Sequence, residues 1–60
     1  MKTYRAFVLT FEDDIIQSVD LVCATEENAR LLAERLAETN PVELWDGPRR
    51  IERFEPRKSN

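Results

Sequence analysis

The sequence predicts an α+β domain in which one helix packs on one face of a four-stranded antiparallel sheet, in the order ββαββ. Two observations lead to this prediction. Residues 3–11 and 15–24 are rich in apolar, β-branched and aromatic side chains without a helical period. Residues 26–40, in contrast, carry apolar side chains three and four positions apart, as an amphipathic helix does. The chain has 60 residues, which is enough for one domain.

The first two strands are expected to form a hairpin. An acidic segment that ends in Asp13-Asp14 separates residues 3–11 from residues 15–24. Aspartate tolerates positive φ and hydrogen-bonds its own backbone, so Asp13-Asp14 is predicted to be a two-residue turn. That turn would place Val8 opposite Val19 and would set the register of the whole hairpin.

The helix is expected to begin after Thr25, which is a favourable N-cap residue. Glu26 and Glu27 follow it and place negative charge in the first turn, where the helix dipole favours it. Asn40-Pro41 should end the helix, because the residue before a proline is pushed out of the α region. The predicted helix is therefore about 15 residues long.

A second hairpin is predicted after Pro41, with strands at residues 42–45 and 49–54 and a turn at Asp46-Gly47-Pro48. The right-handed crossover rule allows the third strand to lie beside the first. The favoured spatial order is therefore 2-1-3-4, with 1-2-3-4 as the alternative. Residues 1–56 should form the single domain, and residues 57–60 a frayed tail.

Alternation along the strands divides the apolar residues between two faces. The predicted core comprises Tyr4, Ala6, Val8, Val19, Leu21, Cys23, Ala29, Leu32, Ala33 and Leu36. The opposite face is expected to carry Phe7, Leu9, Phe11 and Ile16, joined by Trp45 and Phe54. Such a face is too apolar to remain in water, so it is predicted to form the interface with a second copy or another partner.

Composition excludes several classes of function. The chain has no His, one Cys and one Gly, which removes intrachain disulfides, Cys/His zinc sites, Ser-His-Asp triads and glycine-rich phosphate loops. We therefore expect no catalytic residue, no cofactor and no metal, and a protein that is not an enzyme. Small domains often gain stability from a second subunit, so a homodimer is expected.

Two groups of residues could carry chemistry, and each has a simpler explanation. Cys23 lies just before the helix, where a thiol can become reactive, but no base is available, so a buried structural cysteine is expected. The acidic side chains between residues 12 and 27 match no calcium-binding loop. They are expected to form a solvated acidic edge that would repel nucleic acid.

A basic cluster near the C-terminus gives the alternative function. Arg49, Arg50 and Arg53 lie close to Trp45 and Phe54, and arginines beside aromatic rings can bind a nucleic-acid strand. Acidic residues interleave the cluster, however, and residues 43–60 carry five positive and four negative charges. This balance is far from the basic surface of a nucleic-acid-binding domain. The favoured hypothesis is a non-enzymatic interaction or accessory module.

The sequence also suggests a cellular location. No apolar run approaches the roughly 18 residues that a membrane span needs. The first residues lead directly into an alternating segment and lack the apolar block of a signal peptide. A cytoplasmic protein without membrane contact is therefore expected.

Several segments carry a likeness to other proteins: Tyr4-Arg5, the acidic turn before Ile15-Ile16, Val19-Asp20-Leu21-Val22-Cys23, the helix with Ala29, Ala33 and Leu36, and Val42-Glu43-Leu44-Trp45-Asp46-Gly47 followed by Arg49-Arg50-Ile51. Together they resemble a group of small bacterial proteins of unknown function and of about this length. The resemblance implies a small ββαββ unit and carries over no active site. The first turn here lacks the glycine associated with that group.

Overall fold

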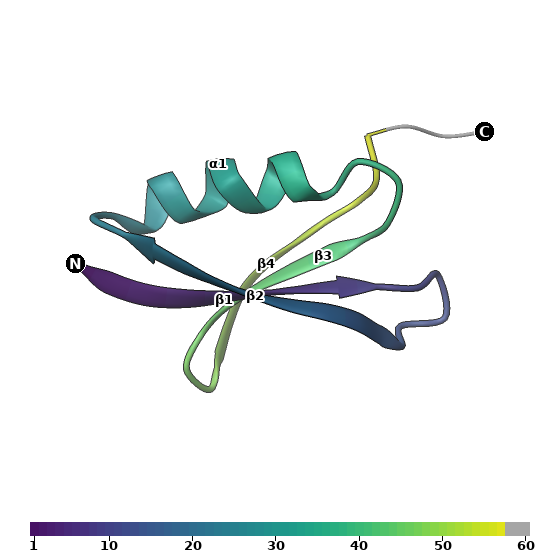
Figure 1. The fold of residues 1–60 in the computed structure, drawn as a ribbon, viewed down its shortest axis with the longest axis horizontal. Helices are drawn as coiled ribbons and strands as arrows, with labels where there is room; N and C mark the ends of the chain where they lie inside the picture. Colours follow the sequence, from purple (N-terminus) through teal and green to yellow (C-terminus); the bar gives the residue numbers. More distant parts are fainter. Residues whose placement is uncertain (58–60) are drawn as a thin grey trace.

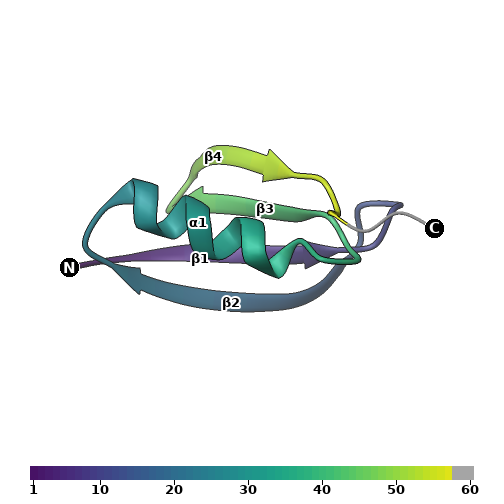
Figure 2. The same ribbon diagram turned by 90° about the horizontal axis from the view of Figure 1, so that it is seen from above.

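The computed structural model describes residues 1–57 as a four-stranded antiparallel sheet with one helix lying across one face (Figure 1). The elements are β1 (Lys2–Leu9), β2 (Ile15–Cys23), α1 (Glu26–Leu36), β3 (Val42–Asp46) and β4 (Arg49–Phe54). The predicted order ββαββ and the predicted strand order β2-β1-β3-β4 are both confirmed (Figure 2). Because α1 carries the chain back along the sheet, β3 pairs with β1, and every neighbouring pair of strands is antiparallel.

The connection between β1 and β2 is longer than predicted. Strand β1 ends at Leu9, and the segment 10–14 forms a loop in which Asp13 adopts a φ of 69°. The Thr10 hydroxyl oxygen accepts hydrogen bonds from the backbone N–H groups of Glu12 and Asp14 at 3.2 and 3.0 Å. These bonds stabilise the wider loop in place of a two-residue turn.

The longer loop changes the register of the hairpin without changing its faces. Ala6, and not Val8, lies opposite Val19, so the observed pairing differs from the predicted one by two residues. Two residues is the side-chain period of a strand, and each side chain therefore keeps its predicted face. Phe11 and Ile16 are the exceptions, because Phe11 lies in the loop beyond the end of β1 and Ile16 is an extra residue where the pairing shifts near the start of β2.

Helix α1 begins as predicted and ends earlier. The Thr25 hydroxyl oxygen accepts a hydrogen bond from the Asn28 N–H at 3.1 Å, which confirms Thr25 as the N-cap. The chain leaves the helix at Ala37, whose carbonyl accepts the N–H of Arg57 at 3.0 Å. Residue 57 thus contacts the end of the helix, and the rest of the expected frayed tail, residues 58–60, lies outside the described residues.

The core lies between α1 and the face of the sheet that α1 covers, here called the helix face. The helix contributes three fully buried alanines, Ala29, Ala33 and Ala37. A methyl side chain lets the helix backbone approach the sheet closely, and the larger side chains come from the strands. The buried strand residues are Tyr4, Ala6, Leu21, Cys23, Val42 and Leu44, with Val8, Val19, Ile51 and Phe54 partly buried against them.

Two leucines predicted in the core lie at its margin. Leu32 is 39% exposed and Leu36 is 37% exposed. Each precedes a buried alanine by one position, which turns its side chain about 100° around the helix from that alanine. The alanine stripe is aimed at the sheet, so these leucines flank the core instead of filling it.

A β-bulge in β4 explains why the prediction for Phe54 is wrong. Leu44 pairs with Glu52 and Trp45 pairs with Arg50, which leaves Ile51 as an extra residue in β4. An extra residue reverses the alternation of side chains beyond it. Ile51 and Phe54 consequently both pack against the core on the helix face, although strict alternation would separate them.

Truncation of core and marginal leucines should have unequal effects. We expect Leu44→Ala to lower the free energy of unfolding by about 2 to 5 kcal/mol, because Leu44 is fully buried. Leu36→Ala should cost less than about 2 kcal/mol, since more than a third of its side chain is already in water. Chemical denaturation of both variants measures the difference. Equal losses would contradict the placement of Leu36 at the margin.

Candidate functional site

The face of the sheet turned away from α1 is uncovered, and we call it the open face (Figure 1). Its residues follow from the cross-strand pairs, because directly opposite residues share a face. One row across the four strands consists of Asp20, Arg5, Trp45 and Arg50, and the next of Ser18, Phe7, Glu43 and Arg53. Thr3 and Val22 form a further pair, and Leu9 and Ile15 close the other end.

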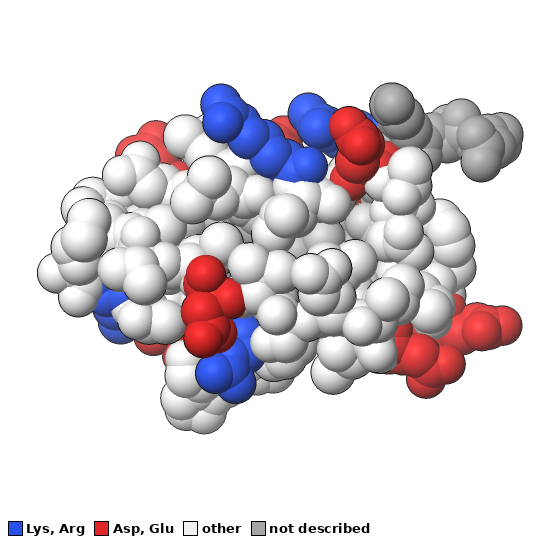
Figure 3. All heavy atoms as spheres, in the orientation of Figure 1, with Lys and Arg blue, Asp and Glu red and all other residues white. Residues whose placement is uncertain are grey.

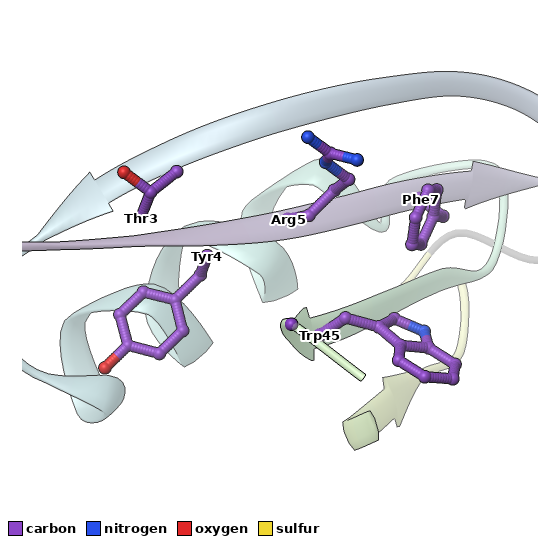
Figure 4. Close-up of a pocket in the computed structure, with 6 residues that line it drawn as sticks. Thr3, Tyr4, Arg5, Phe7 and Trp45 are labelled. Carbon is purple, nitrogen blue, oxygen red and sulfur yellow. The ribbon is translucent and has the colours of Figure 1, made fainter. Parts of the chain in front are cut away.

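An aromatic pair occupies the middle of the open face. The rings of Phe7 on β1 and Trp45 on β3 meet edge to face, with centroids 6.3 Å apart and planes at 80° (Figure 4). The Trp45 indole N–H donates to the Glu43 carboxylate at 3.1 Å, which fixes the orientation of the indole ring. Both rings remain partly accessible to solvent, so the pair forms a rigid apolar ridge that another molecule can contact.

Two open hollows flank this aromatic pair. The first, of about 260 Å³, is lined by Thr3, Tyr4, Arg5, Phe7, Trp45 and Gly47. The second, of about 230 Å³, is lined by Phe7, Leu9, Asp13, Ile15, Glu43 and Trp45. Both are smaller than the roughly 300 to 1,000 Å³ typical of small-molecule sites. Their size and openness suit single side chains of a partner better than an enclosed ligand.

Ion pairs surround the aromatic pair on the open face. Arg5 contacts Asp20 at 3.1 Å, and Arg50 contacts Glu43 at 3.5 Å. Arg53 contacts Glu55, Asp13 and Glu43 at 2.8, 2.9 and 3.4 Å. The hydrogen bonds to Glu55 and Asp13 raise the pKa of the Arg53 guanidinium. The contact with Asp13 also draws the β1–β2 loop toward β4, where it borders the second hollow.

The structure brings together some of the residues predicted for this interface and separates others. Phe7, Leu9 and Trp45 lie together as predicted, with Leu9 only 4% exposed beside the second hollow. Phe11 is 72% exposed in the β1–β2 loop. Phe54 lies on the helix face, for the reason given above.

Ile16 is displaced by a second irregularity. The pairing shifts from Val8–Gln17 to Leu9–Ile15, which leaves Ile16 as an extra residue in β2. Ile15 takes the expected place of Ile16 beside the aromatic pair. Because Ile15 and Ile16 are identical and adjacent, the sequence does not show which of them is the extra residue of the bulge.

The three arginines proposed for nucleic-acid binding do not form one surface. Arg49 reaches the Glu26 carboxylate at 2.9 Å, at the start of the helix. Arg50 and Arg53 belong to the open face, on the other side of the sheet. Each of the three guanidinium groups lies against at least one carboxylate.

The remaining candidates from the sequence are Cys23 and the acidic residues between positions 12 and 27. Cys23 is buried and free. Among residues 1–57, no group of three or more His, Cys, Asp or Glu side chains is placed to hold a metal ion. The same part of the chain contains no helix long and apolar enough to cross a membrane. Comparison with protein-family models, curated proteins and solved structures gives no match for this chain.

Two acidic groups near the start of the helix should make stability dependent on pH. The hydrogen bond from Arg49 lowers the pKa of Glu26, and that from Lys2, at 2.6 Å, lowers the pKa of Asp46. A lowered pKa in the folded state stabilises the protein above the ordinary values of 4.5 and 3.8, and this stabilisation is lost as the pH falls.

We therefore expect the free energy of unfolding to decrease between about pH 5 and pH 3. A Glu26→Gln/Asp46→Asn double variant should show a shallower decrease in urea denaturation across this range. Glu34→Gln, which changes an exposed helix residue, is the matched control. An unchanged slope in the double variant would show that these ion pairs do not couple folding to protonation.

Proposed function

We propose that this chain is a non-enzymatic interaction module, a cytoplasmic homodimer that binds a partner protein through the open face of its sheet. The observation that carries the proposal is the Phe7–Trp45 pair, which is partly accessible to solvent and flanked by two hollows. An apolar centre with tryptophan, surrounded by arginines and their carboxylate partners, has the composition of a protein-binding surface.

The charges on the open face favour a partner that covers only its centre. Pairing this face with the same face of a second copy, as expected from the sequence, would remove Arg5, Asp20, Glu43, Arg50 and Arg53 from water twice. Removing so many charges from water is costly even when they are paired. A segment of another protein that lies along the aromatic pair leaves these charges at a wet rim. Its apolar side chains can enter the two hollows.

Two observations support the other parts of the proposal. A chain of 60 residues buries a small core, and a second subunit is a common source of additional stability. The buried, free thiol of Cys23 fits a reducing compartment. Nucleic-acid binding is the weaker alternative, because phosphates would have to displace carboxylates from arginines that lie on two different faces.

Capture experiments with matched variants test the partner-binding surface. Tagged wild type, Phe7→Ser, Trp45→Ser and Leu31→Ser would be exposed to lysate of the native cell, with and without nuclease treatment. We expect a partner that wild type and Leu31→Ser retain and that both open-face variants lose, because Leu31 lies on the helix. The purified partner should then shift the fluorescence of Trp45, the single tryptophan.

Two outcomes would contradict the proposal. Retention of the same partner by all four proteins would place the binding surface elsewhere. Binding that disappears with nuclease treatment would favour the nucleic-acid alternative instead. Circular dichroism of each variant establishes that the loss of a partner is not a loss of fold.

A further inference from the structure

Exposed apolar side chains gather along the free edge of β2. Ile15, Ile16 and Val22 on this strand are 62%, 57% and 61% exposed, although β2 is the longest strand of the sheet. The edge of β2 faces the viewer in Figure 3, where a broad white surface is interrupted by a red group with a blue group beside it, while the other charged groups lie at its margins. Asp20 is the one charged residue of β2, and an edge strand of this length with so many exposed apolar side chains is a template for pairing with another strand.

The helix extends this apolar surface above the strand. A groove of about 290 Å³ runs between β2 and α1, lined by Val22, Cys23, Asn28, Leu31, Leu32 and Arg35. If another strand paired with β2, the side chains on its helix face would lie in this groove, next to α1. Leu32, which flanks the core and lines this groove, would then contact the added strand.

The backbone of β2 is ready for such pairing. The Leu9 N–H donates to the Pro41 carbonyl at 2.8 Å, on the side of β1 that faces β3. Backbone groups alternate along a strand, so Ala6 directs its N–H and carbonyl toward Val19 on β2. The residues whose backbone groups then point to the free edge are Ser18, Asp20 and Val22.

We infer that a second copy of this chain pairs antiparallel with β2 across a two-fold axis at Val19, joining the two sheets into one continuous sheet. The inference rests on the homodimer of the proposed function and specifies where the second copy lies. Across this axis Val19 lies directly opposite the partner's Val19, and Ser18 lies opposite the partner's Asp20. The axis also brings the exposed Ile16 close to the partner's Val22.

Charge selects this axis over its neighbours. A two-fold axis that keeps both helices on one side of the sheet must oppose residues of the same face. An axis at Asp20 would oppose two aspartates, which is unfavourable for like charges in direct cross-strand contact. An axis at Ser18 would oppose Asp20 to the partner's Ile16. Of the three axes, only the one at Val19 places Asp20 opposite a neutral hydrogen-bonding residue, the partner's Ser18. The same axis brings the exposed Ile16 and the partner's Val22 together.

The other edge of the sheet is poorly suited to the same role. Strand β4 carries Arg49, Arg50 and Arg53, and pairing it with itself would bring like charges together. The bulge at Ile51 also interrupts its regular backbone. Such charges and bulges protect an edge from pairing. In β2 the bulge at Ile16 lies near one end and leaves residues 17–23 regular.

Two charge variants at one exposed position test the inferred register. Ser18→Lys would face Asp20 of the partner subunit, and Ser18→Glu would oppose like charges. Each dimer contains two such contacts, so we expect the dimer Kd to fall by about 2- to 30-fold for Ser18→Lys and to rise by a similar factor for Ser18→Glu. Phe7→Ser, on the open face, is the control and should leave the Kd unchanged. Sedimentation equilibrium from nanomolar to millimolar concentration measures all four proteins.

The possible results separate the two proposals. Opposite shifts at position 18 with an unaffected Phe7→Ser support the β2 interface. Equal weakening by both charges would overturn the Val19 axis. A dimer that ignores position 18 and dissociates in Phe7→Ser would overturn the β2 interface and keep the homodimer. A wild type that stays at 7.1 kDa throughout would overturn the homodimer together with this inference, while the fluorescence of Trp45 would still report partner binding.

Discussion

Close contact between the alanine stripe of α1 and the sheet is the constraint on which the structure depends. Ala29, Ala33 and Ala37 are fully buried, so the helix backbone lies close to the strands and the remaining core volume is filled from the sheet. A single helix can cover only one face of a sheet. The same contact that closes the helix face therefore leaves the other face, with Phe7 and Trp45, uncovered.

Two bulges decide which side chains reach each surface. In β4 the extra residue Ile51 turns Phe54 toward the helix and enlarges the core. In β2 the extra residue Ile16 brings Ile15 to the aromatic pair. Small shifts in pairing thus set the composition of the open face and of the free edge, while the hydrophobic pattern of the strands remains the same.

The fold could be predicted from the sequence because its determinants are local. The change of hydrophobic period at Thr25, the turn residues around Gly47 and the crossover rule define the element order and the strand order. The faces of β1 were also predictable, since the register differed by an even number of residues. The placement of Ile16, Leu36 and Phe54 was not, because bulges and the choice of alanines over leucines at the interface depend on tertiary packing.

The order of the strands has a consequence for synthesis of the chain. Strand β1 is central in the sheet, and its two neighbours are β2, which follows immediately, and β3, which comes after the helix. The first hairpin can form as soon as Cys23 has been made, but the other side of β1 then has no strand to pair with. Until residues 42–46 emerge, β1 is an edge strand of the hairpin, whereas in the finished sheet β3 covers this edge. The central strand of the sheet therefore depends on a segment made later in the chain to complete its backbone pairing.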